Sequence, residues 1–120
     1  MKTHKDLDAW KISLELVTET YQLTNTYPKE EIFGLTNQSR RASVSIPSNI
    51  AEGAARNSKK EFIQFLYIAL GSLQELDTQI LVAKNLNYIQ EDSYNEIVVK
   101  IQTVGKLLNG LIKYLKTNDQ

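Results

Sequence analysis

The segment 35–53 has the periodicity of a helix, but it carries polar side chains where an ordinary helix carries either core residues or solvated charge. When residues are placed 100° apart, five of them form a polar stripe: Gln38, Arg41, Ser45, Asn49 and Glu52. An apolar stripe lies beside it: Leu35, Ala42, Ile46, Ile50 and Gly53. A further apolar patch lies on its other side: Val44, Ala51 and Ala55. A polar stripe between two apolar surfaces predicts a position at the edge of a core or in an interface, where each polar group has a partner.

Glycine and proline interrupt the chain rarely, with five glycines and two prolines in 120 residues, so long helices are expected. Helical periodicity covers four ranges, approximately 6–26, 28–56, 59–84 and 93–116. Pro28 suits the first turn of the second helix, and Pro47 inside it predicts a kink, because the pattern continues in phase. Ser58 and Ser93 each precede a glutamate by three residues, and each pattern predicts a capping box that starts a helix.

Each predicted helix has an apolar face at helical spacing. The first has a main face of Leu7, Trp10, Leu14, Val17 and Tyr21, with Ala9, Leu16 and Leu23 nearly opposite. The third has Phe62, Phe65, Leu66, Ala69, Leu73, Leu76, Ile80 and Ala83. The fourth has Tyr94, Ile97, Val98, Ile101, Val104, Leu108, Ile112 and Leu115. Small residues on the second and third helices, such as Gly53 and Ala69, predict that these two helices approach closely.

Four long helices with short connections, and no competing strand pattern, predict an all-α fold. We expect a single domain over residues 1–120, arranged as an antiparallel up-down-up-down four-helix bundle. The first three helices carry more apolar surface than one bundle face can hide. Because exposed apolar patches mark interfaces, the sequence predicts a homo-oligomer, either a closed ring or a dimer.

The inventory of reactive side chains is thin. The chain has no cysteine, its single histidine is His4, and its glycines are scattered. These features argue against thiolate or histidine metal sites, nucleophile–histidine pairs and phosphate-cradling loops. Glu52 and Glu75 are expected to pair with cations or helix-end amides, not to act as acid and base. We therefore expect a protein that is not an enzyme, with no cofactor and no metal. The absence of a signal peptide or membrane-spanning run predicts a cytoplasmic protein.

The formal net charge is zero, but all three arginines lie between residues 40 and 56, followed directly by two lysines. Arg41 belongs to the polar stripe and is expected to pair with Glu52 or another carboxylate, whereas Arg40 points about 100° away and is expected to be the freer. The candidate nucleic-acid-binding residues are Arg40, Arg56, Lys59 and Lys60, with an ordinary solvated surface as the alternative. The polar stripe is interpreted as fixing helix register and oligomer geometry, with a ligand or partner surface as the alternative. The aromatic residues at core spacing, such as Trp10, are interpreted as packing groups, not base-stacking platforms.

The run Gln38-x-Arg40-Arg41-Ala42-x-x-Ser45-Ile46-Pro47-x-Asn49-Ile50-Ala51-Glu52-Gly53 resembles a family of small bacterial four-helix bundle proteins. They are encoded by open reading frames inside intervening sequences of 23S ribosomal RNA genes. The resemblance extends to Asp6-Leu7-x-x-Trp10, to Tyr27-Pro28-Lys29-Glu30-Glu31-x-x-Gly34-Leu35, and to Phe62-x-x-Phe65-Leu66-x-x-Ala69-x-Gly71-Ser72-x-x-Glu75-Leu76. It covers nearly the whole chain. Ser13, where the family often has alanine, and Ala54-Ala55, where a bulkier residue is common, are minor departures.

The resemblance implies a four-helix bundle that assembles as a homopentameric ring. The family is also similar to the accessory protein of diversity-generating retroelements, a barrel-shaped pentamer that associates with a reverse transcriptase and with nucleic acid. By that analogy, basic residues repeated around the ring contact RNA, another nucleic acid or a reverse-transcriptase-like protein. We therefore expect an oligomeric, nucleic-acid-associated accessory protein. The alternative is a protein-interaction scaffold that does not bind nucleic acid.

Overall fold

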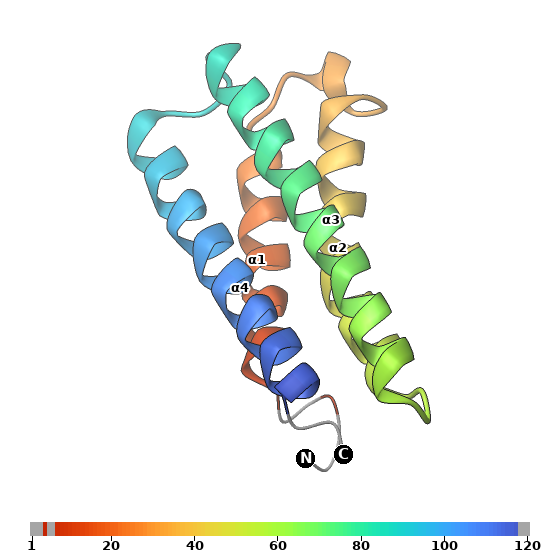
Figure 1. Ribbon diagram of the computed structural model, residues 1–120. Helices are drawn as coiled ribbons and strands as arrows, with labels where there is room; N and C mark the ends of the chain where they lie inside the picture. Colours follow the sequence, from red (N-terminus) through yellow and green to blue (C-terminus); the bar gives the residue numbers. More distant parts are fainter. Residues whose placement is uncertain (1–3, 5–6, 118–120) are drawn as a thin grey trace.

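Four helices make up the computed structural model, which describes residue 4 and residues 7–117. They are α1 (Asp8–Thr24), α2 (Leu35–Ala54), α3 (Lys59–Asn85) and α4 (Glu91–Thr117), and a short 3₁₀ turn, η2 (Lys29–Glu31), precedes α2. Each helix packs on two others in cyclic order, α1 on α2 and α4, and α3 on α2 and α4. Consecutive helices run in opposite directions (Figure 1). The expected antiparallel four-helix bundle is confirmed.

The bundle is long, with principal extents of 50 × 25 × 19 Å. α1 begins and α4 ends at the same end of it, where the connection 55–58 joins α2 to α3 (Figure 1). We call this the terminal end. The connections 25–34 and 86–90 lie at the other end, which we call the opposite end.

The second helix is shorter than predicted. Pro28 precedes the separate turn η2, and Gly34, at φ −113° and ψ −115°, leaves the helical conformation before α2 begins at Leu35. Glu31 in this turn caps α2, because its Oε1 accepts a hydrogen bond of 3.1 Å from the Leu35 N–H. The expected single helix over 28–56 is therefore wrong at its start. α2 is one helix across Pro47, and the predicted kink at that residue stays a prediction.

The other helix limits differ little from the prediction. Ser58 caps α3 by accepting a hydrogen bond of 3.1 Å from the Glu61 N–H, as predicted. Ser93 is wrong as a helix start, because α4 already begins at Glu91. The carboxylates of Glu91 and Asp92, in the first turn of α4, complement the helix dipole. The helix therefore begins two residues before Ser93. α1 starts at Asp8; the predicted start, residue 6, lies outside the described residues.

The core confirms the predicted faces of α3 and α4 and reverses that of α1. On α3 and α4 the predicted apolar stripes are buried, with Phe65, Tyr94 and Val98 only partly covered. On α1 the buried residues are Ala9, Ser13, Leu16, Thr20 and Thr24. Leu14 and Tyr21, assigned to the main face, are each 40% exposed.

Buried hydroxyl groups explain the reversal on α1. Ser13 donates to the Trp10 carbonyl, Thr20 to the Leu16 carbonyl and Thr24 to the Thr20 carbonyl, each at 2.8 Å. A hydroxyl that bonds to its own helix is satisfied without a partner from another element, so it can lie in a core. Leu14 and Tyr21 then face outward.

Gly53 permits the close contact between α2 and α3. A Cβ atom at this position would lie 2.6 Å from the Phe65 Cβ and 3.0 Å from the Phe62 Cδ1. The nearest of these atoms is a Cβ fixed to the backbone of α3, so a side chain at position 53 would push the two helices apart. The predicted close approach of α2 and α3 is confirmed here.

Candidate functional site

The centre of the polar stripe lies at the seam between α2 and α3. Ser45 and Asn49 are both partly buried there. The Ser45 Oγ shares a hydrogen bond of 2.9 Å with the Ser72 Oγ on α3. Asn49 Nδ2 donates to the Ser45 carbonyl at 2.8 Å and to the Ser45 Oγ at 2.9 Å. The Ser45 hydroxyl thus joins the two helices at the edge of the core.

The outer members of the stripe, Gln38, Arg41 and Glu52, are exposed. A groove of about 710 Å³ lies beside Gln38 and Arg41 but not beside Glu52, and it is lined by Phe33, Asn37, Gln38, Arg41, Ala42, Ser45, Ser72, Glu75 and Gln79. The side chain of Phe33 is 91% exposed, the highest value among the large apolar residues described. Phe33 was not among the predicted site residues, and it lies in the connection before α2, where the sequence predicted a continuous helix from residue 28.

The expected ion pair between Arg41 and Glu52 is wrong. Glu52 Oε2 lies 3.1 Å from the Nη2 of Arg56, one helical turn away. Arg41 precedes Glu52 by eleven residues, which separates them by about 16 Å along a helix. No ion pair within the described part of the chain includes Arg41.

The candidate nucleic-acid-binding residues do not form one cluster. Arg56, Lys59 and Lys60 lie together at the terminal end, around the α2–α3 connection. Arg40 precedes Arg56 by sixteen residues, about 24 Å along the helix axis, near the opposite end. The structure therefore brings three of the four together and separates the fourth.

Arg40 is also the more constrained of the two adjacent arginines, contrary to the prediction. Its Nε donates to the Thr24 Oγ1 at 2.9 Å, and its Nη2 donates to the Asn25 Oδ1 at 2.8 Å. Its guanidinium lies 4.8 Å from the centre of the Tyr21 ring. These contacts tie the start of α2 to the end of α1. They could not be read from the sequence, because they depend on how the 25–34 connection folds back.

The terminal end gains a further cation from α4. Lys116 donates to the Tyr67 hydroxyl at 2.9 Å, and its Nζ lies 5.3 Å from the centre of that ring. A cavity of about 410 Å³ is lined by Lys59, Lys60, Ile63, Gln64, Tyr67 and Lys116. Lys116 was not among the predicted site residues. Its position could have been predicted, because an antiparallel bundle places the last turn of α4 beside the first turns of α3.

Charge is distributed unevenly along the bundle. Exposed cations at or near the terminal end are Lys11, Arg56, Lys59, Lys60, Lys113 and Lys116, against the carboxylates Asp8, Glu52 and Glu61. At or near the opposite end the carboxylates Glu30, Glu31, Glu91, Asp92 and Glu96 outnumber Lys29, Arg40 and Lys84. A chain with no formal net charge thus has a basic end and an acidic end.

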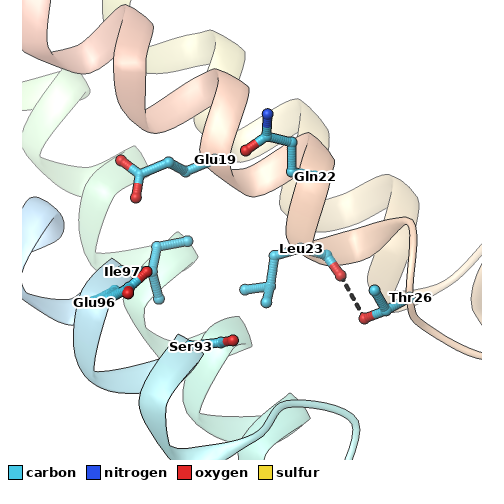
Figure 2. Close-up of a pocket in the computed structure, with 7 residues that line it drawn as sticks. All are labelled: Glu19, Gln22, Leu23, Thr26, Ser93, Glu96 and Ile97. Carbon is cyan, nitrogen blue, oxygen red and sulfur yellow. Dashed lines mark hydrogen bonds between the residues drawn. The ribbon is translucent and has the colours of Figure 1, made fainter.

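A smaller cavity, of about 230 Å³, lies between α1 and α4 (Figure 2). Two carboxylates, Glu19 from α1 and Glu96 from α4, are among the residues that line it. Glu19 Oε2 lies 3.4 Å from the Nζ of Lys100, which also donates to the Glu15 Oε1 at 2.7 Å. The hydrogen bond to Glu15 is the main cause that raises the pKa of Lys100. These contacts give Glu19 a structural partner across the α1–α4 interface.

The described residues contain no group of three or more histidine, cysteine or acidic side chains arranged to hold a metal ion. None of the helices they form combines the length and the apolar character needed to cross a bilayer.

Several large apolar residues among the described ones are exposed in the single chain, and two groups of them are separate from each other. One follows α1 and α2 through Leu14, Tyr21 and Val44, which are each 40% exposed. The other follows α3 through Ile68, Leu81 and Val82, which are 42–51% exposed. We call these the α1–α2 face and the α3 face.

Comparison with known proteins places the chain in a family. The sequence model of the 23S rRNA-intervening sequence proteins matches residues 5–110. The chain belongs to this family. It is also similar in structure to a protein from Bacteroides thetaiotaomicron, described as a protein with unknown function from the S23 ribosomal protein family. The two share 28% sequence identity with a TM-score of 0.81, over 88% of this chain and 95% of that one. No curated protein matches the chain. The family resemblance in the sequence is thus confirmed.

Proposed function

We propose that this member of the 23S rRNA-intervening sequence family is a non-enzymatic, oligomeric accessory protein that binds RNA or another nucleic acid through its terminal end. The observation that carries the proposal is the meeting of Lys59 and Lys60 with Lys116 around the exposed Tyr67. Cations drawn from two helices can neutralise phosphates, and an exposed aromatic ring beside them can stack on an unpaired base.

Assembly follows from the two uncovered apolar surfaces. The α1–α2 face and the α3 face lie on different helices, so one can cover the other in a neighbouring copy. Contacts between two different surfaces are heterologous, and when they close they generate a ring. The family resemblance favours five copies. In such a ring every terminal end lies on the same rim, so a modest charge per subunit is multiplied around it.

The test compares two pairs of charge-removing substitutions. Lys59→Ala with Lys60→Ala removes two cations from the terminal end. Arg41→Ala with Lys106→Ala removes two exposed cations away from it and leaves the net charge the same as in the first pair. Fluorescence anisotropy with a structured RNA should show at least a tenfold weaker affinity for the first pair only. Equal affinity for the two variants would remove the terminal end from the site.

A second candidate function is a protein-interaction scaffold, possible for the same oligomer. The groove beside the polar stripe favours it, because the groove ends at the highly exposed Phe33 and offers hydroxyl, amide and charged groups. Aromatic anchors beside polar groups are typical of protein interfaces. An oligomer that captures a defined protein and binds no nucleic acid at low salt would favour the scaffold. Loss of that capture in Phe33→Ala, with the oligomer intact, would locate the partner.

A further inference from the structure

A third cavity lies at the opposite end of the bundle, where the end of α1, the turn η2 and the start of α2 meet. Its volume is about 390 Å³, within the range of small-molecule sites. It is lined by Thr24, Asn25, Tyr27, Pro28, Lys29, Ile32, Thr36 and Arg40. Two of these residues are cations and none is a carboxylate.

Arg40 is fixed in this cavity without an anionic partner. Its side chain is held by Thr24 and Asn25, which are neutral acceptors, and by the Tyr21 ring. No ion pair among the described residues includes it. A guanidinium has five N–H donors, and these two hydrogen bonds leave three of them in a fixed plane, two on Nη1 and one on Nη2. A partly buried, immobilised and unpaired guanidinium is suited to an oxyanion, which it can bind through two parallel hydrogen bonds.

The neighbouring groups add donors rather than acceptors. The Asn25 Oδ1 accepts from Arg40, so the amide nitrogen of Asn25 remains a donor. Lys29 contributes an exposed ammonium group. The hydroxyl of Tyr27 is buried and has no hydrogen-bond partner within the described part of the chain. The nearby Glu31 is engaged elsewhere, by the Leu35 N–H and by the Tyr88 hydroxyl at 2.9 Å.

We propose that this cavity binds the phosphate group of a small phosphorylated organic molecule, with the phosphate on Arg40 and Lys29. Two cations and a set of neutral donors match a dianionic group. Pro28 and Ile32, an exposed apolar wall of the same cavity, contact the organic part. The site is independent of the proposed nucleic-acid function, because it lies at the other end of α2.

Isothermal titration calorimetry with phenyl phosphate, at fixed ionic strength, tests the proposal. We expect saturable binding with one site per chain, and at least tenfold weaker binding in Arg40→Lys, which keeps the charge but lacks the guanidinium fork. Arg41→Lys is the matched control, since Arg41 is the adjacent arginine and does not line the cavity. It should bind like the wild type. Because Arg40 also ties α1 to α2, Lys29→Gln provides a second variant if Arg40→Lys unfolds, with several-fold weaker binding expected.

Three outcomes would overturn the site. They are no saturable binding of phenyl phosphate to the wild type, equal weakening in Arg40→Lys and Arg41→Lys, or benzoate binding as tightly as phenyl phosphate. The Lys59→Ala/Lys60→Ala variant should bind phenyl phosphate normally. A failure of this proposal is thereby distinguished from a failure of the nucleic-acid function.

Discussion

The hydroxyl of Ser45 on α2 lies 2.9 Å from the hydroxyl of Ser72 on α3, and Asn49 donates to the same Ser45 oxygen. The side chains of Ser45, Asn49 and Ser72 thus hydrogen-bond to one another at the edge of the core. These bonds join α2 to α3, and the exposed stripe residues Gln38 and Arg41 line the groove.

Replacement of Asn49 by leucine should destabilise the protein. Asn49→Leu removes the bonds to the Ser45 carbonyl and hydroxyl, and we expect the free energy of unfolding to fall by about 1–3 kcal/mol. Gln38→Leu, on the exposed part of the same stripe, is the control and should change it by less than about 0.5 kcal/mol. Urea unfolding followed by circular dichroism measures both. Equal losses of unfolding free energy in the two variants would mean that the hydrogen bonds of Asn49 do not contribute to stability.

The contact between Gly53 and Phe65 predicts opposite effects for two glycine substitutions. Gly53→Ala places a Cβ within 2.6 Å of the Phe65 Cβ, so the helices must separate, at a cost of about 1–3 kcal/mol. Gly110→Ala, in α4, meets nothing within 4 Å and should stabilise the protein by about 0.4–1 kcal/mol. Melting temperatures that move in the same direction would contradict the close α2–α3 packing.

The buried Tyr27 predicts a loss of stability in alkaline solution. Burial raises its pKa to about 12 from an ordinary value of 10.0. Above pH 10 the unfolded chain loses this proton while the folded chain keeps it, so stability falls between about pH 10 and 12. Two pKa units correspond to roughly 3 kcal/mol. Tyr27→Phe should be almost as stable as the wild type at pH 7, because the hydroxyl has no partner, and should lack this part of the alkaline loss. If the free energies of unfolding of Tyr27→Phe and the wild type fell in parallel between about pH 10 and 12, Tyr27 would not be the cause of the alkaline loss.

If the α1–α2 face is an interface between copies of the chain, a charged side chain placed on it should prevent assembly. Leu14→Lys puts a cation on this face, and the proposed oligomer should dissociate in sedimentation velocity while the helical content stays constant. Gln22→Lys adds the same charge to the α4 side of α1, where Gln22 lines the small cavity, and should leave the oligomer intact. An oligomer that survives Leu14→Lys would place the interface elsewhere.

The sequence predicted α3 and α4 well because the main apolar stripe of each helix is continuous and is the one that the bundle buries. It failed on α1, where two stripes of different size compete. Helical periodicity identifies both stripes, but it does not say which faces the core, and large side chains such as Trp10 and Tyr21 favoured the wrong one. The answer depended on hydroxyls such as Thr20, which the helix satisfies internally.

The candidate site was predicted only in part, because closeness in the sequence does not always mean closeness in the fold. Arg56, Lys59 and Lys60 are neighbours in sequence and remain neighbours in the fold. Arg40 was assigned to the same site by sequence proximity alone, and the length of α2 carries it away. Lys116 was missed because its proximity to α3 exists only in the folded bundle.

The salt dependence of nucleic-acid binding tests the central claim most directly. The measurement is fluorescence anisotropy of the wild-type protein with a structured RNA and with duplex DNA, repeated across salt concentrations. We predict a Kd of about 1 µM or tighter at low salt for RNA, with a logarithmic salt slope steeper than the roughly 5 that the six exposed cations at one subunit's terminal end could give. Such a slope requires several terminal ends acting together on one rim. Absence of binding at low salt would contradict the nucleic-acid function, and a slope of roughly 5 or less would contradict the shared rim.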